Sequence, residues 1–295
     1  MAGRVTERSI HTRVLANLQQ SIQKGEKIQQ QLSSGKQINR PSDSPNGTLQ
    51  SMQLRGETRT NAQYVRSSDD GLGWLSTVDG TLNSASTLVQ RARTLTLQGL
   101  NDGAGSSESR AALGTELEQI RTSMIGYANT TYLGRPVFGG TTTGSAAYDA
   151  TATFVGNTDP VNRTVGPNSS VRVDADASKA FGTGTDSVFA VLNDISTALA
   201  SNNLDGVSDG LKKLDAAADN MKNTLSDAGA RYNRITQMKQ SASDRLMDVT
   251  AQLSDVEDVD LPKTIMEMQL QQTSYQAALA ASAKVIQPSL IDFLR

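Results

Sequence analysis

The chain has 295 residues, a formal net charge of −2 and 37% hydrophobic residues, with aromatics at 4%. The near-neutral charge gives no electrostatic footprint for nucleic acid, and no run of 18 apolar residues is present that could span a membrane. Because cysteine is absent, disulfides and thiolate sites are excluded, and the lean hydrophobic content is typical of an elongated helical protein.

The first predicted helix runs from about Arg8 to Ser34. Its apolar residues follow the alternating spacing of three and four that is typical of a coiled coil, interrupted by Gly25 and Gln29. The members of this stripe are Leu15, Leu18, Ile22 and Leu32. Such a stripe needs a partner helix, so we do not expect this region to be stable alone.

A break follows the first helix. Gly35 can end a helix in the left-handed conformation, and Pro41 and Pro45 forbid a continuous helix. Ser42 or Asp43 is expected to cap the next helix, because short polar side chains accept hydrogen bonds from free backbone N–H groups.

Two further helices are predicted before the middle of the chain. The first extends from about Pro45 to Leu100, and after a Gly- and Ser-rich loop at 101–107 the second carries apolar residues on one face from Leu113 to Tyr127. Both assignments rest on the helical period of the apolar residues.

The composition changes between Val137 and Gly184. Gly, Thr, Ser, Asp and Asn dominate and the helical period is lost. Short strands are expected at Thr151–Val155 and Ser170–Val173, separated by turn dipeptides, so this stretch is predicted to be a β-rich insert.

Helical patterns return after the insert. A helix is predicted near Ser187–Ala200, and a long heptad series then runs from Val207 to Val256 with Lys239 as its exception. The acidic segment Ser254–Pro262 should break this helix, with Asp260 as the N-cap of the next one.

The last helix again carries a coiled-coil stripe, interrupted by Gln272 and Ser282. Its members are Leu261, Ile265, Met268, Tyr275, Leu279, Ile286, Leu290 and Phe293. The two ends of the chain have opposite net charge, which favours their pairing within or between molecules. A chain that begins and ends in this way can pair its ends or offer both to neighbours, as in a filament of identical subunits.

Chemistry-bearing clusters are lacking in the sequence. His11 is the single histidine, which excludes a histidine metal cluster and a Ser-His triad. Four carboxylates of the insert are the only basis for an enzyme hypothesis, and no general acid is recognisable beside them: Asp149, Asp159, Asp174 and Asp176. We therefore predict no catalytic, cofactor-binding or metal-binding residues.

The predicted fold class is mainly α, an elongated bundle of long coiled-coil-like helices with a small β-rich insert. Residues 1–40 and 255–295 are expected to be terminal helices, paired or disordered in the monomer. Residues 41–136 and 185–254 are expected to form the helical bundle, and 137–184 a variable outer domain.

Several segments resemble the bacterial flagellin family. Residues 32–43, Leu-Ser-Ser-Gly-Lys-Gln-Ile-Asn-Arg-Pro-Ser-Asp, look like the segment after the first helix in flagellins and their junction proteins, and 68–82 is similar to the family's second helix. The residues of the first motif are Gly35, Lys36, Asn39, Pro41, Ser42 and Asp43.

Three local features are more similar to the hook-filament junction branch of that family, the hook-associated protein 3 type. They are Val137-Phe138-Gly139-Gly140, the helix around 271–280, and the closing residues 289–295.

This resemblance implies a structural axial protein of the extracellular flagellum, exported without a cleavable signal peptide. The implied partners are hook-associated protein 1, flagellin, other copies of the chain, and a cytosolic type III export chaperone at the C-terminal helix. Flagellin itself is the alternative, and a cytosolic coiled-coil scaffold is the hypothesis from another class.

Overall fold

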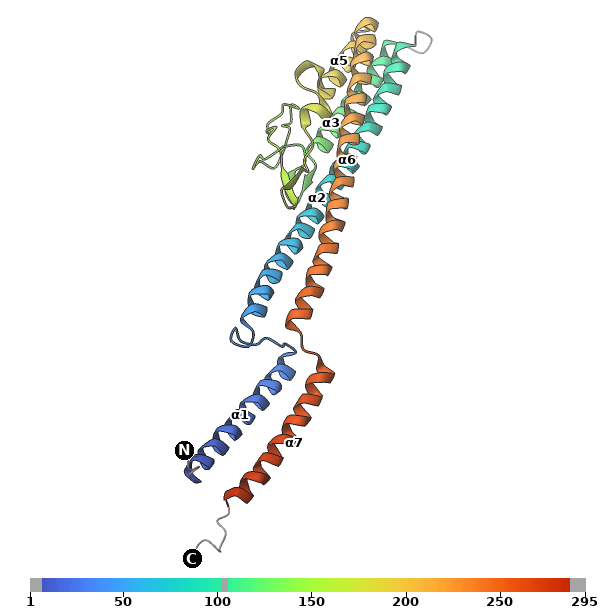
Figure 1. The fold of residues 1–295 in the computed structure, drawn as a ribbon. Helices are drawn as coiled ribbons and strands as arrows, with labels where there is room; N and C mark the ends of the chain where they lie inside the picture. The colour runs from blue at the N-terminus through green and yellow to red at the C-terminus, as the bar shows by residue number, and fades with distance from the viewer. Residues whose placement is uncertain (1–6, 102–105, 287–295) are drawn as a thin grey trace, which may run out of the picture. The chain divides into compact units, whose positions relative to one another are not determined.

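The computed structural model describes the backbone of residues 7–101 and 106–286, and within these ranges the side chains from 12 to 283 (Figure 1). Its contacts divide the chain into two units. Unit 1 comprises Met1–Arg59 and Leu246–Arg295, and unit 2 comprises Thr60–Arg245.

Long helices dominate the described chain, as predicted. They are α1 (Glu7–Ser34), α2 (Pro45–Leu100), α3 (Ser107–Ala128), α5 (Val188–Ala200), α6 (Leu204–Glu257) and α7 (Leu261–Ile286), with a short α4 (Ala177–Phe181) and the 3-10 turn η2 (Gly184–Asp186) in the insert. The mainly α fold class with a small β-rich insert is confirmed.

The helix ends explain where the long segments stop. Gly35 adopts φ +68° after α1, and the side chain of Asp260 accepts a hydrogen bond from the N–H of Lys263 at the start of α7; both predictions are confirmed. The prediction for α2 is wrong, because Ser44 Oγ, and not Ser42 or Asp43, accepts from the N–H of Gly47. Pro45 then occupies the first turn, where its missing N–H costs nothing.

Two small antiparallel sheets lie in unit 2. One pairs β1 (Thr131–Tyr132) with β2 (Arg135–Pro136), and the other pairs β3 (Asn162–Gly166) with β4 (Ser169–Arg172). β4 matches the predicted strand at 170–173.

The strand prediction at Thr151–Val155 is wrong, since only an isolated bridge between Tyr148 and Phe154 forms there. Ala152 has φ +65°, and Asp149 accepts hydrogen bonds from the N–H groups of Thr151 and Thr153. This local turn replaces the pairing that a strand would need.

Unit 2 contains a continuous hydrophobic core. The heptad positions of α6 in this unit are buried or half-buried from Val207 to Ala242, with Tyr232 as the exposed exception. Aromatic rings from the insert join this core: Phe181 lies 5.0 Å from Phe138 and 5.6 Å from Phe189, measured between ring centroids. The insert therefore shares its core with the helices of unit 2.

The segment Val137–Gly140 begins the insert and anchors it in the core. Val137 and Phe138 are fully buried, and Gly140 has φ +63°, where an added Cβ would lie only 2.3 Å from the carbonyl oxygen of Asn157. Only glycine fits this position, because both the conformation and the space exclude a side chain.

Unit 1 contains α1, α7, the first turns of α2 and the last turns of α6. Its described part has few buried apolar side chains, namely Leu54 and Val249. Unit 1 is therefore held by a different kind of contact from unit 2.

Candidate assembly interface

Helices α1 and α7 form an antiparallel pair in unit 1. The amide of Gln271 donates to the backbone oxygen and to the hydroxyl of Ser21, both at 2.7 Å, and residue 36 bridges residue 258 in antiparallel fashion. Residues that face each other across the pair therefore run in opposite order along the chain, Ser21 opposite Gln271 and Lys36 opposite Asp258.

The contact seam between these helices follows the spacing of three and four. Its half-buried or buried members are Val14, Leu18, Ser21, Gly25, Ile28 and Leu32 on α1, and Thr264, Met268, Gln271, Tyr275, Ala278 and Ser282 on α7. Since half of these side chains are small or polar, the seam buries little apolar surface. The pairing of the two helices is consequently weak compared with a coiled coil of leucines.

A second apolar line flanks this seam on each helix and is exposed. On α1 Leu15 and Ile22 each follow a seam residue by one position, and on α7 Ile265 and Leu279 do the same. One residue is a rotation of about 100° around a helix. Because the helices are antiparallel, equal rotations point to the same side of the pair, so the four side chains make one outward apolar face, called here the flank.

The predicted subunit-packing residues thus divide into two sets. Leu18, Leu32, Met268 and Tyr275 lie in the seam, whereas Leu15, Ile22, Leu261, Ile265 and Leu279 are exposed. The side chain of Ile286, and residues Leu290 and Phe293, lie outside the described part of the chain.

A buried carboxylate at the end of α6 contacts both α2 and the segment that follows α1. Glu257, which is 2% exposed, accepts a hydrogen bond from Arg55 Nη2 at 2.7 Å. Its carboxylate also forms ion pairs with Arg55 Nε at 2.6 Å and with Lys36 Nζ at 3.5 Å. The hydrogen bond from Arg55 holds the pKa of Glu257 below its usual value, against burial, which raises it. A buried charge of this kind is stable only while its partners stay in place.

Backbone hydrogen bonds join the same segments, residues 35–37 and 257–259. The N–H of Gln37 donates to the carbonyl of Glu257 at 2.6 Å, and the N–H of Val259 donates to the carbonyl of Gly35 at 3.1 Å. Lys36 Nζ also lies 2.6 Å from Asp258 Oδ1. The end of α1 and the start of α7 are therefore joined where each helix begins or ends.

The rest of the family motif forms a turn. Asp43 accepts from the N–H groups of Asn39 and Arg40 and pairs with Lys27 at 3.1 Å. The hydrogen bond from the Arg40 backbone and the one from Lys27 lower the pKa of Asp43. Asn39 donates to the carbonyl of Lys36, while Pro41 and Ser42 are exposed at the tip. The motif therefore shapes the connection between α1 and α2.

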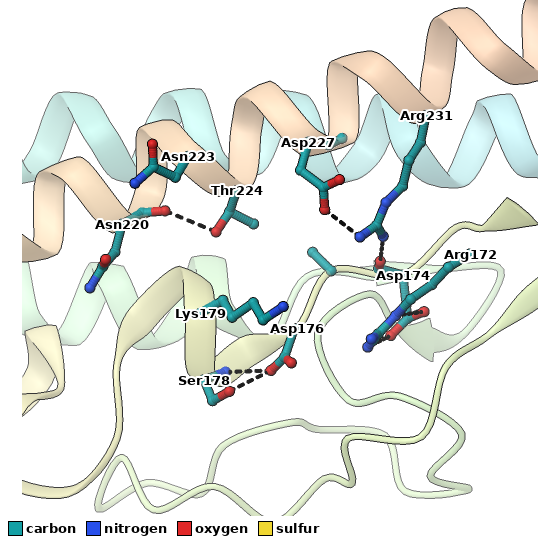
Figure 2. A pocket seen from close by; sticks show the side chains of 12 residues that line it. Arg172, Asp174, Asp176, Ser178, Lys179, Asn220, Asn223, Thr224, Asp227 and Arg231 are labelled. Atoms are coloured by element: carbon teal, nitrogen blue, oxygen red, sulfur yellow. Dashed lines mark hydrogen bonds and ion pairs between the residues drawn. The ribbon is translucent and has the colours of Figure 1, made fainter.

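Unit 2 holds a charged pocket of about 600 Å³ between the insert and α6 (Figure 2). Asp174 is buried and takes two hydrogen bonds from Arg172, and Asp176 caps α4 by accepting from Ser178. Arg231 bonds Asp227 and the carbonyl of Asp174. These carboxylates hold the insert in place, and none is placed as a proton donor beside a partner base.

The described residues contain neither a cluster suited to a metal ion nor a helix suited to a membrane. No group of three or more His, Cys, Asp or Glu side chains is arranged to hold a metal ion within that part of the chain. Among the same residues, no helix has the length and apolar character needed to cross a membrane.

Two family models cover most of the chain. The bacterial flagellin N-terminal helical region matches residues 7–143, and the bacterial flagellin C-terminal helical region matches residues 211–294. The chain belongs to the bacterial flagellin family. The matched regions include α1, α7 and the motif between α1 and α2, so the paired terminal helices are part of the family's own framework.

Relatives of two kinds match nearly the whole chain. Flagellar hook-associated protein 3 of Escherichia coli is 27% identical, over 86% of this chain and 88% of its own. A flagellin of Halalkalibacterium halodurans is 26% identical, over 92% and 91%. A solved structure from Vibrio parahaemolyticus, described as a flagellar hook-associated protein, has a TM-score of 0.68 at 22% identity and covers 73% of this chain and 100% of its own. The structural likeness establishes the shared fold.

The sequence did not reveal which side of each terminal helix faces its partner. Ser21, Gly25 and Gln271 lie in the seam, although an apolar-residue search passes over them. The buried Glu257 was also missed. Its signal is weak, because the other charged residues of the run 254–262 are also acidic and nothing in the sequence distinguishes Glu257 from them.

Proposed function

We propose that this chain is a structural subunit of the hook-filament junction of the bacterial flagellum. The observation that carries the proposal is the match to a hook-associated protein 3 over most of both chains. The fold likeness to a second hook-associated protein supports it, as do the local features at 137–140 and 271–280.

The geometry of unit 1 suits such a role. The terminal helices meet through a seam of small and polar side chains, and their flank leaves Leu15, Ile22, Ile265 and Leu279 in water. Burying a leucine or isoleucine side chain contributes about 1.5–3 kcal/mol. Neighbouring copies that cover the flank would therefore supply the stabilisation that the isolated pair lacks, so that ordering and assembly are coupled.

The proposed partners follow the axial order of the structure. Hook-associated protein 1 lies on one side, flagellin on the other, and copies of this chain form the short zone between them. A cytosolic export chaperone would cover α7 before export, since α7 has more exposed large apolar side chains than any other helix among the residues that the structure describes. In this proposal the chain is a structural component with no catalytic activity of its own.

A second candidate function is the filament subunit itself. The flagellin relative covers slightly more of the chain at nearly the same identity, so sequence identity does not separate the two. Copy number does, because a filament consists mostly of flagellin whereas a junction zone is short.

The test is a deletion of the gene followed by examination of sheared flagella and culture medium. A junction subunit predicts hooks without filaments, flagellin released into the medium, and the chain as a trace component of wild-type flagella. If the chain is the main protein of purified flagella, it is a flagellin. If it is absent from flagella and medium alike, the cytosolic scaffold is favoured.

A further inference from the structure

An open groove of about 450 Å³ lies in unit 1, between the first turns of α2 and the last turns of α6. It is lined by Met52, Arg55, Thr58, Arg59 and Leu253. Met52 is 65% exposed, and methionine at an exposed site adapts its shape to a partner's side chains. The lining of the groove thus combines two apolar side chains, Met52 and Leu253, with two guanidinium groups.

The two guanidinium groups of the groove differ in whether they already have an acidic partner. Arg55 is occupied by Glu257. Arg59 is exposed and, in the part of the chain that the structure describes, no ion pair involves it. The groove therefore offers one available cation beside an apolar surface.

The outer side of α7 has complementary features. Met266 and Leu270, which are 63% and 69% exposed, point away from the α1 seam. Glu267 follows Met266 in the sequence, lies beside this pair at the border of the seam, and is the single acidic residue of α7. Its side chain is exposed and takes part in no ion pair among the described residues. An apolar ridge with one carboxylate matches a groove with one free guanidinium.

We propose that the outer side of α7, at Met266, Glu267 and Leu270, docks into the Met52–Leu253 groove of a second copy of this chain, with Glu267 pairing with Arg59. The proposal rests on the proposed function, since it assumes that copies of the chain meet in one assembly. Because the two surfaces are different, the contact is head-to-tail and can continue from copy to copy.

The contact cannot readily form within one molecule. Only residues 258–260 separate α6 from α7, and the opposite side of α7 is engaged with α1. Reaching the groove of its own chain would require α7 to reverse over α6 and leave α1. A second copy meets neither obstacle.

Cysteine pairing tests the contact directly, because the natural chain has no cysteine. Cells would carry two differently tagged copies, one with Met52→Cys and one with Met266→Cys, and sheared flagella would be oxidised. The matched control replaces Met52→Cys by Met247→Cys, an equally exposed methionine of unit 1 that does not line the groove. We expect a disulfide-linked dimer of the two tags for the Met52 pair, at least about tenfold above the Met247 pair; equal yields, or no link, would overturn the docking.

Charge exchange provides a second readout. Arg59→Glu or Glu267→Arg alone should lower the amount of the chain in flagella by about tenfold, and the double variant should restore it, since an interfacial like-charge contact is converted back to an attractive one. Arg234→Glu, an exposed change in unit 2, should leave incorporation unchanged. Single variants that incorporate normally, or a double variant that stays absent, contradict the pairing.

The proposed function and the docking contact are contradicted by different results. If the unaltered chain is absent from flagella, the proposed function is wrong and this inference falls with it. If the unaltered chain is present but the cross-link and the charge rescue both fail, only the docking mode is wrong.

Discussion

Unit 1 and unit 2 are built from the same kind of helix and are stabilised differently. In unit 2, Trp74, Phe138 and Phe181 are almost completely buried in one core. In unit 1, the described side chains include exposed Leu15, Ile22 and Leu279. The difference teaches that one region completes its fold alone, whereas the other leaves part of its apolar surface for neighbours.

The same contrast appears in the polar contacts. The insert of unit 2 is fixed by several separate polar contacts, some within it, such as Arg172 to Asp174, and some to the long helices, such as Arg231 to the carbonyl of Asp174 and Arg163 to Asp70. Unit 1 depends on Glu257, which joins segments more than two hundred residues apart. Because one side chain contacts both segments, a single substitution at Glu257 is expected to destabilise the connection between the terminal helices and the rest of unit 1.

The largest expected effect on unfolding is in the core of unit 2. Phe181→Ala should lower the free energy of unfolding by about 3–5 kcal/mol, because it leaves a cavity among Phe138 and Phe189. Denaturant titration followed by the fluorescence of Trp74, the one tryptophan, measures it. Leu270→Ala, at an exposed site, is the control and should change the value by less than about 0.5 kcal/mol. A Phe181→Ala variant as stable as that control would contradict a closed core.

Glu257→Gln should have the next largest effect. At pH 7 it removes a charge-assisted contact worth about 1–2 kcal/mol after allowance for the exposure of Arg55. Because the folded-state pKa of Glu257 is lowered, this stabilisation is present above the unfolded pKa of about 4.3 and is lost as pH falls through the folded value.

The measurement is the difference in stability between the natural chain and Glu257→Gln at pH 7 and in acid. The difference should shrink below about pH 4. Glu267→Gln, which alters an exposed carboxylate, should show no such difference at either pH. A constant gap for Glu257→Gln across the range would exclude the ionised carboxylate as the source.

Gln271→Ala should have a smaller effect, about 0.5–1.5 kcal/mol, since it removes the hydrogen bonds to Ser21. Amide hydrogen exchange of α1 should become faster while that of α2 in unit 2 is unchanged. Gln272→Ala, one position further round the helix, is the matched control. Faster exchange in both units would mean that the units are not independent in this respect.

Leu279→Asp is expected to have the smallest effect on the isolated chain and a large one on assembly. Leu279 is exposed, so the free energy of unfolding should change by no more than about 0.5 kcal/mol. In the flank, however, a carboxylate would lose hydration against an apolar neighbour. Incorporation into flagella should be lost, and normal motility in the variant would refute the role of the flank.

Much of the fold could be predicted because long periodic segments carry a strong local signal. The end of α1 could be predicted from Gly35 and the start of α7 from Asp260, because the conformation of the first and the capping role of the second depend only on nearby backbone. Pairing of the terminal helices was one of the outcomes that the sequence left open, since stripes of that spacing need partners that either the same chain or a neighbour can supply.

Other features depend on contacts that the local sequence does not encode. The spacing of Leu15, Ile22 and Leu279 gives their helix face but not whether another helix of the same chain covers it. The contact of Phe181 with Phe138 joins residues from opposite ends of the insert region, and the hairpin at 131–136 is too short for a periodic signal. The proposed three-part division of the chain is a prediction that these contacts leave open.

Hydrogen exchange of the free chain and of the same chain in assembled flagella tests the central claim most directly. Exchange rates would be compared for amides in 12–34 and 261–283 and for amides of α2 in unit 2. The account predicts that the terminal helices exchange much faster than unit 2 in the free chain and become protected on assembly, because neighbours cover the flank. Terminal helices that are as protected as unit 2 in the free chain, and unchanged by assembly, would contradict it.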